Sequence, residues 1–338
     1  MRVLSLFSGC GGIDLGFKKA GFRTIIAVDI DRDSCETIKK NKLADKVICA
    51  DVKDLKTSSF LNKKIDVLIA GPPCPPYSKS RFYLKNKKRA LGDKNSYTLK
   101  FYCKVISKVK PKIFFFENVF GFYYKPHREA FNLLKDTADK AGYNIEYKII
   151  NFADYGVPQI RERFICIGTK KKLKKFTFPK PTHAKKISKL NGIKPWVTCK
   201  DAIGNLDYPL KEDEDNQAGS KDKKLLKLVP PGDNYLFFTK KRGYKKPLFK
   251  WRSRYWSFLL KLSPSKPSWT IQASFSNNMG PFHWRNRFLR INEIKRIQTF
   301  HDKFKISGDF RSKWRQIGNA VPPLFTEIIA KKIKNLYF

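Results

Sequence analysis

The sequence has few acidic residues and few histidines. Its 338 residues include 29 Asp and Glu against 71 Lys and Arg, so the formal net charge at pH 7 is +42 and the pI is near 10.0. A chain this basic favours a polyanionic partner over an acidic or neutral protein surface. Drift toward Lys in an AT-rich genome is the alternative explanation, although it does not by itself account for so few carboxylates.

Several other features are missing, and each absence excludes a class of protein. No apolar run approaches the ~18 residues that a membrane span needs, and Met1–Phe7 leads into Gly-rich sequence without the long apolar segment of a signal peptide. The seven cysteines are scattered and form no C-x-x-C pair, which argues against a disulfide framework and a zinc site. The unpaired cysteines and the absent apolar segments lead us to expect a cytoplasmic protein with no contact with membranes. With only four histidines, we also expect no metal.

The first half of the chain alternates short apolar segments with helical patterns. This alternation predicts βαβ units and a mostly parallel sheet, and therefore an α/β fold. The expected strands are Val3–Phe7, Thr24–Asp29, Val47–Ala50, Val67–Ala70, Lys112–Glu117, Asn144–Asn151 and Arg163–Gly168. The expected helices are Ile13–Ala20, Ser34–Asn41, Thr98–Val109 and His127–Gly142.

The composition changes after about Lys170. Residues 171–285 are rich in Lys, Pro and aromatic residues with weak periodicity, and we expect the acidic run 212–215 to form a solvated loop. Helical patterns return at Glu293–Phe300 and Leu324–Lys334. These changes predict a first domain over residues 1–180, completed by residues 310–338 packing back onto it, and a smaller irregular domain over residues 181–309.

A Gly-rich segment, residues 7–16, follows the first expected strand and opens the first expected helix. Its glycines allow a tight turn and let a ligand approach backbone N–H groups. Asp29 lies 20 residues after Gly9, at a strand end where a carboxylate can bind ribose hydroxyls, and Asp51 ends the next strand. The glycine spacing departs from G-x-G-x-x-G, so a nucleoside cofactor without pyrophosphate is favoured over a dinucleotide, with a purely structural turn as the alternative.

Cys74 lies in a turn that four prolines restrict, within the sequence Gly71-Pro-Pro-Cys-Pro-Pro-Tyr-Ser78. The turn follows an expected strand, where open α/β sheets bind their ligands. A thiolate held there could act as a nucleophile. The other six cysteines are expected to be small buried hydrophobic residues.

The ordered motifs resemble those of the DNA (cytosine-5)-methyltransferases. The resemblance rests on Phe7–Gly12, the Pro-Cys turn, Glu117-Asn118-Val119, the Gln-x-Arg-x-Arg segment 159–163, the segment 290–300 and Gln316–Pro323. Pro75 stands where many family members carry Gln. The resemblance implies a Rossmann-like S-adenosylmethionine-dependent methyltransferase domain with a smaller, irregular target-recognition domain.

The resemblance also implies the cofactor and its pocket. The cofactor would be S-adenosylmethionine, with S-adenosylhomocysteine as product. The implied cofactor-binding residues are Phe7, Gly9, Gly11, Gly12, Asp29, Ile30, Asp51, Val52, Pro73, Leu99, Asn319 and Ala320.

Methylation of cytosine at C5 needs a nucleophile at C6 and a proton or hydrogen bond at N3, since C5 is otherwise a poor nucleophile. We assign the nucleophile to Cys74 and the N3 contact to Glu117, whose apolar surroundings should raise its pKa. By resemblance Arg163 contacts the cytosine O2, and Arg161 supports Glu117 or a DNA phosphate. From spacing alone, both arginines could equally be surface charges, and no residue is apparent as the base for the C5 proton, so water is expected.

The resemblance further implies duplex DNA as the partner and extrusion of the target base. The basic segment Lys79–Tyr97 resembles a mobile catalytic loop, although a plain solvated loop would have the same composition. The candidate DNA-binding residues are Ser78, Lys79, Arg81, Lys240, Arg242, Arg252 and Arg254. The neighbouring aromatics Tyr235, Trp251, Tyr255 and Trp256 either contact DNA or form the core of the small domain.

We expect a monomer of the restriction–modification type, with a possible cognate restriction endonuclease, and much of the positive charge in one cleft. Three other functions remain open from the sequence. One is a tRNA cytosine-5 methyltransferase relative, and another is a catalytically silent DNA-binding homologue. The third, a nicotinamide oxidoreductase, fits the glycine pattern poorly and would leave the Pro-Cys turn unused.

Overall fold

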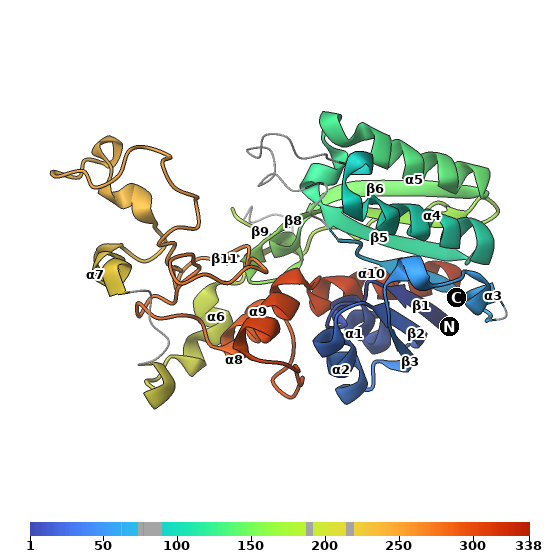
Figure 1. The fold of residues 1–338 in the computed structure, drawn as a ribbon, viewed down its shortest axis with the longest axis horizontal. Coiled ribbons are helices and arrows are strands. Elements are labelled where there is room, and N and C mark those ends of the chain that lie inside the picture. Colours follow the sequence, from blue (N-terminus) through green and yellow to red (C-terminus); the bar gives the residue numbers. More distant parts are fainter. Residues whose placement is uncertain (62, 74–76, 78–89, 187–191, 214–219) are drawn as a thin grey trace.

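The computed structural model has two lobes, one built on a central sheet and the other irregular (Figure 1). It describes the chain except residues 62, 74–76, 78–89, 187–191 and 214–219. In the described part, no helix is both long enough and apolar enough to cross a membrane.

The central sheet has seven strands in the order β3-β2-β1-β4-β5-β8-β6. The strands from β3 to β5 run parallel, and β8 is antiparallel to both of its neighbours. This confirms the predicted α/β fold with a mostly parallel sheet. The seven strands are β1 (Arg2–Leu6), β2 (Arg23–Asp29), β3 (Ala44–Cys49), β4 (Val67–Ala70), β5 (Ile113–Val119), β6 (Tyr143–Asn151) and β8 (Glu162–Lys170).

Helices cover both faces of this sheet. Two of them begin at local signals, since Asp31 accepts a hydrogen bond from the Ser34 N–H at the start of α2, and Pro323 occupies the first turn of α10. The helices are α1 (Gly12–Lys19), α2 (Arg32–Lys40), α3 (Ser58–Leu61), α4 (Tyr97–Val109), α5 (Arg128–Lys140), α6 (Cys199–Ile203), α7 (Ser220–Leu228), α8 (Ile291–Ile297), α9 (Phe310–Asn319) and α10 (Pro323–Tyr337). α9 was not predicted, although its cap, Asp309, accepts a hydrogen bond from the Ser312 N–H.

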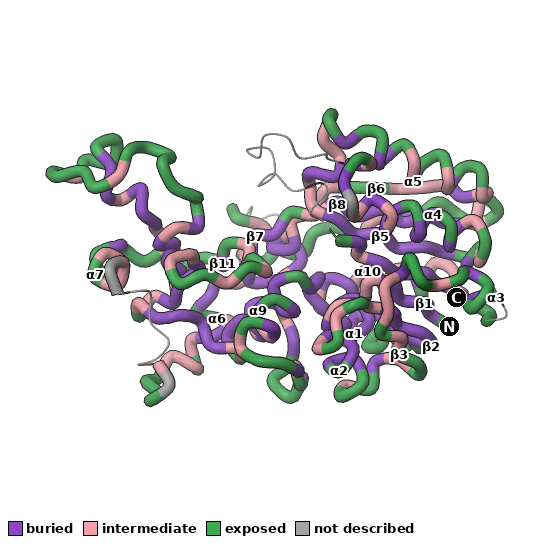
Figure 2. Tube along the Cα trace, viewed as in Figure 1, coloured by how far each residue is buried: buried purple, intermediate pink, exposed green. Residues whose placement is uncertain are grey.

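The core of the sheet lobe is divided between the two faces of the sheet. One cluster joins Leu68, Phe114 and Phe116 to α4 and α5, and the other joins Val67, Ile69 and Phe115 to α1 and α10. The tube in Figure 2 is buried along the central strands and exposed over much of the outer irregular lobe. The last helix of the chain therefore shares a core with the first.

A third cluster crosses the expected domain boundary. It joins Leu15 and Ile38 of the first helices to Cys199, Ile294 and Trp314. A separate small cluster around Tyr235 and Phe282 forms the core of the outer lobe. Four short strands lie in or beside this region, namely β7 (Gln159–Ile160) paired with β11 (Ser268–Trp269), and β9 (His183–Ala184) paired with β10 (Lys194–Pro195).

For the irregular lobe, one expectation was wrong and one of two open alternatives is excluded for two tryptophans. Asp213, within the acidic run, does not lie in a solvated loop, because it pairs with Arg287 and Arg290 and its side chain is 17% exposed. Trp251 and Trp256 do not belong to the small core, since they are 38% and 52% exposed, whereas Tyr235 is buried. Glu214 and Asp215 lie outside the described residues.

The contact between α1 and α10 depends on Gly16. A Cβ placed there would contact the Thr326 hydroxyl and would lie 2.6 Å from the Glu327 nitrogen and 2.7 Å from the Pro323 carbonyl oxygen. Backbone atoms cannot move aside as a flexible side chain can, so Gly16→Ala must separate the two helices. We expect the free energy of unfolding to fall by about 1 to 3 kcal/mol in a chemical denaturation experiment.

Gly204→Ala is the matched control for Gly16→Ala. Gly204 has helical angles (φ −60°, ψ −32°), and an added Cβ would contact only the flexible side chain of Lys200. Its stability should be unchanged or slightly higher. Equal stabilities of Gly16→Ala and wild type would contradict close packing of α1 on α10.

Candidate active site at the carboxyl edge of the sheet

A cavity of about 810 Å³ lies at the carboxyl ends of β1, β2, β4 and β5. This is the edge where open α/β sheets bind ligands. Residues 270–274 after β11 and the turn between α9 and α10 complete its wall. Of the predicted site residues, the cavity is lined by Phe7, Gly9, Gly12, Asp29, Ile30, Asp51, Val52, Pro73, Glu117, Arg161, Arg163, Asn319 and Ala320.

The Gly-rich turn forms part of the cavity wall through Phe7, Gly9 and Gly12. Gly9 has φ +53° and Gly11 has φ +82°, in the left-handed region that glycine adopts without steric cost. Phe7 also has a positive φ of +54°, which is uncommon for a bulky residue and is a feature of functional sites. Gly12 lies against the far end of the chain, because an added Cβ would contact the Val321 carbonyl oxygen.

Two carboxylates face the cavity from neighbouring strand ends. Asp29 accepts hydrogen bonds from the Gly9 N–H (2.7 Å) and the Asp31 N–H (2.9 Å), and burial raises its pKa. Asp51 accepts one from the Tyr97 hydroxyl (3.0 Å) and one from the Lys53 N–H. Partial burial opposes ionisation of Asp51, but these hydrogen bonds together lower its pKa.

Glu117 is a buried carboxylate at the end of β5. Its side chain is 10% exposed, and Oε1 lies 3.1 Å from Nε of Arg163 on the antiparallel neighbour β8. Burial raises the pKa of Glu117, while the positive charges of Arg163 and Arg161 oppose that rise. An added Cβ at Gly71 would lie 3.1 Å from Oε2, so the glycine leaves room for the carboxylate.

Arg161 is buried and the side chain of Arg163 is only 13% exposed, which excludes the surface-charge alternative. Arg161 is 2% exposed and donates hydrogen bonds to the carbonyl oxygens of Ile271 (3.2 Å) and Asn319 (3.4 Å). Arg163 is the arginine that contacts Glu117 directly, whereas Arg161 joins three segments distant in sequence.

Asn118, the residue after Glu117, makes a hydrogen bond to the start of the Pro-Cys turn. Asn118 Nδ2 donates to the Pro72 carbonyl oxygen (3.2 Å), and the Asn118 side-chain oxygen accepts from the Val119 N–H (2.9 Å). Cys74 itself lies outside the described residues, as do Ser78, Lys79 and Arg81. Within the described part, no group of three or more His, Cys, Asp or Glu could hold a metal ion.

Two predicted cofactor residues do not line the cavity. Leu99, on α4, is buried in the core, and Gly11 faces the Leu43 side chain. Sequence reasoning also missed several lining residues, among them Ser8, Tyr97, Thr98, Thr270, Gln272 and Gln316. The signals that could have identified them are a position near the amino end of a helix or a position within or beside a recognised motif.

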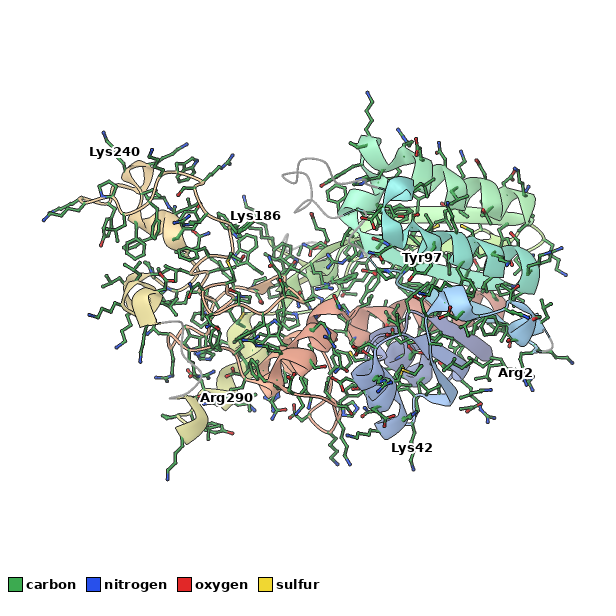
Figure 3. The ribbon with its side chains drawn as sticks, viewed as in Figure 1. Arg2, Lys42, Tyr97, Lys186, Lys240 and Arg290 are labelled. Carbon is green, nitrogen blue, oxygen red and sulfur yellow. The ribbon has the colours of Figure 1, made fainter. Side chains whose placement is uncertain are left out.

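The predicted DNA-binding residues that are described lie on the outer lobe. Lys240, labelled in Figure 3, and Arg252 and Arg254 are exposed, while Arg242 pairs with Asp233 (2.7 Å). Figure 3 also shows Arg2 and Lys42 on the outer margin of the sheet lobe. Part of the positive charge therefore lies away from the junction of the lobes, and its concentration in one cleft stays a prediction.

Burial and the neighbouring arginines shift the pKa of Glu117 in opposite directions, and the variant Arg163→Gln separates the two effects. The variant removes the ion pair and keeps the carboxylate buried, so the pKa of Glu117 should rise further, by roughly 1 to 3 pH units. The readout is the ¹³C NMR titration of the labelled Glu carboxyls, with Glu117→Gln used to assign the signal.

Arg315→Gln is the control for this titration. Arg315 lines the same cavity but pairs with Asp31 (2.7 Å). Its replacement should therefore leave the pKa of Glu117 unchanged. An unchanged or lower Glu117 pKa in Arg163→Gln would contradict the assigned ion pair.

Comparison with known proteins identifies the family. The model of the C-5 cytosine-specific DNA methylases matches residues 1–335. The Type II methyltransferase M.SacI of Streptomyces achromogenes is 35% identical over 98% of this chain and 92% of its own, and M.NgoFVII of Neisseria gonorrhoeae is 31% identical over 99% and 87%.

The fold agrees with these sequence matches. The crystal structure of S. pombe Dnmt2 methyltransferase superposes with a TM-score of 0.66 at 16% identity, covering 100% of this chain and 99% of that one. At this identity the likeness concerns the fold alone. Together with the match along almost the whole sequence, it shows that the chain belongs to the C-5 cytosine-specific DNA methylase family.

Proposed function

We propose that the chain transfers a methyl group from S-adenosylmethionine to C5 of a cytosine in a specific duplex DNA sequence. The observation that carries this proposal is one cavity that joins the Asp29 and Asp51 carboxylates to buried Glu117 and to its partly buried partner Arg163. The two carboxylates suit a nucleoside-type cofactor, and the Glu117–Arg163 pair suits a nucleobase. The family membership supports the same reaction.

The residues present fit the cofactor. Asp29 suits the ribose hydroxyls, Asp51 suits an adenine amino group, and the 64% exposed side chain of Ile30 offers an apolar surface beside them. When bound, S-adenosylmethionine would supply an electrophilic methyl group. The open space at Gly9, where an added Cβ meets nothing within 4 Å, leaves the turn free to lie against a ligand.

The catalytic roles are assigned to Cys74, Glu117, Arg161 and Arg163. The Cys74 thiolate adds to C6 of the ring, and negative charge moves toward N3. Glu117, with its raised pKa, donates a proton or a hydrogen bond there. Arg163 is close enough to Glu117 to hold the carboxyl and present a donor to the cytosine O2. Once C5 has taken up the methyl group that the cofactor would supply, loss of the C5 proton to water and departure of the thiolate complete the cycle.

Duplex DNA is the proposed substrate, with the target base extruded at a cost of a few kcal/mol. We assign residues 1–180 and 310–338 to catalysis and cofactor binding, and residues 181–309 to target recognition. The exposed cations Lys240, Arg252 and Arg254, with Arg242, would neutralise phosphates and make binding strongly dependent on salt. Ser78, Lys79 and Arg81 would contact the DNA from the catalytic loop.

The relatives named above are Type II methyltransferases. We propose the same role in a restriction–modification system for this chain, in which it acts as a monomer in the cytoplasm. A cognate restriction endonuclease would then recognise the same DNA sequence.

Cys74→Ser tests the covalent route. Wild-type protein should transfer labelled methyl groups from S-adenosylmethionine to duplex DNA, and the variant should lose transfer while it still binds the cofactor in calorimetry. Removal of the nucleophile should lower the rate by several orders of magnitude. Bisulfite sequencing of DNA from an expressing host gives the recognition sequence.

Two outcomes would contradict the proposal. Wild-type activity in Cys74→Ser would exclude the covalent mechanism. Methylation confined to tRNA would show that tRNA, and not duplex DNA, is the substrate.

A further inference from the structure

The six tryptophans fall into two groups. The indole N–H groups of Trp196, Trp284 and Trp314 donate to Asp154, Asp207 and the Gln272 carbonyl oxygen, each at 2.9 Å. Trp251, Trp256 and Trp269 are instead 38%, 52% and 39% exposed. Large rings held at the surface are costly to expose and mark interaction sites when they gather.

Trp256 and Trp269 form a pair at the surface. Their ring centroids are 5.7 Å apart and the rings are inclined at 75°, an edge-to-face arrangement. The backbone beneath Trp256 is fixed because Asn234 Nδ2 donates to its carbonyl oxygen (2.8 Å). Trp269 lies on β11, which pairs in register with Gln159 and Ile160 of β7. The rings are therefore carried by ordered backbone.

The pair lies at the edge of the proposed base pocket. Thr270 and Ile271, the next two residues after Trp269, line the cavity that holds Glu117. Thr270 donates to the Ile160 carbonyl oxygen (2.8 Å) and Ile271 to the Gln159 side chain (3.2 Å), which fixes this segment against β7. Trp269 therefore directly precedes, along the chain, the residues that form this wall of the cavity. In Figure 1, β11 lies between the two lobes.

The surroundings favour a polyanion with flat apolar faces. Between Asn234 and Asn292 the chain contains no Asp or Glu, while Lys and Arg occur thirteen times. Arg252, Arg254 and Lys266, which flank the two tryptophans in sequence, are exposed. A nucleic acid combines phosphates for such cations with bases that stack on aromatic rings.

We infer that the Trp256–Trp269 pair is a stacking platform for a base of the substrate strand next to the target cytosine. This inference rests on the proposed function and adds to it a contact with bases, distinct from the phosphate contacts of the neighbouring cations. Both tryptophans act in binding and positioning, while the chemistry stays with the cavity residues.

The test measures affinity for a duplex that contains the methylation sequence found by bisulfite mapping. Trp256→Ala and Trp269→Ala should each weaken binding by roughly 5- to 150-fold, the range expected for loss of one base–aromatic stack. Trp269→Phe should retain most of the affinity, because phenylalanine still offers a flat ring. Cofactor affinity and thermal unfolding should match wild type in all three variants.

A fluorescent base analogue locates the contact. 2-Aminopurine placed next to the target cytosine should be quenched when wild-type protein binds, and less so with Trp269→Ala. Tyr147→Ala is the control, because it removes an exposed ring (41%) from β6 at the edge of the sheet and should leave DNA affinity and quenching unchanged.

The outcomes separate this inference from the proposed function. Wild-type affinity and quenching in both alanine variants would overturn the stacking role while methyl transfer stands. Equal losses in Trp269→Phe and Trp269→Ala would assign the ring to the fold of the lobe and would also overturn it. Absence of methyl transfer by wild-type protein would instead refute the proposed function.

Discussion

The structure depends on how a buried carboxylate is accommodated at the end of β5. An ionised Glu117 without a partner would carry a large desolvation cost, and the antiparallel strand β8 supplies that partner as Arg163. β8 reverses the direction of the sheet at this point, with Val119 opposite Arg163, so the arginine side chain reaches back toward Glu117. Gly71 on the other side leaves the space that the carboxylate occupies.

Hydrogen bonds of Gln159 and Gln298 join motifs that are distant in sequence beside the cavity that holds this carboxylate. The Gln159 amide donates to Gln298 (3.1 Å), and Gln298 donates to the Ile317 carbonyl oxygen (2.8 Å). Gly318 continues the contact, because an added Cβ there would lie 2.7 Å from the Gln272 carbonyl oxygen. The motifs recognised around residues 159, 300 and 318 therefore form one buried junction beneath the cavity. Thr37, which donates to Gln316 (2.7 Å), ties this junction to α2.

Sequence alone was sufficient where local pattern decides structure. The alternation of apolar segments gave the sheet, and the strand-end positions of Asp29, Asp51 and Glu117 placed all three in one cavity. Leu99 shows the limit, since its position on α4 was correct but the direction of its side chain into the core depends on packing. The pairing of Arg163 with Glu117 also depends on strand register, which spacing does not reveal.

The irregular lobe was harder to predict for a physical reason. Its order comes from long-range contacts such as Asp213 with Arg290, 77 residues apart, and not from periodic apolar faces. Composition correctly marked it as different from the sheet lobe but could not sort its aromatic residues. Tyr235 is buried and Trp256 is exposed, although both stand in similar basic, aromatic sequence.

The central claim is that Glu117 assists the reaction at the base from a buried position, and the pH dependence of a single turnover tests it most directly. Because burial raises the pKa of Glu117, its protonated form persists to higher pH than in an ordinary glutamate and is lost as pH rises further. The wild-type methyl-transfer rate should therefore fall on the basic side of that pKa. Glu117→Gln should be slower by about 10² to 10⁴ and should lack this descending limb, whereas a rate within a few fold of wild type with the same pH profile would contradict the account.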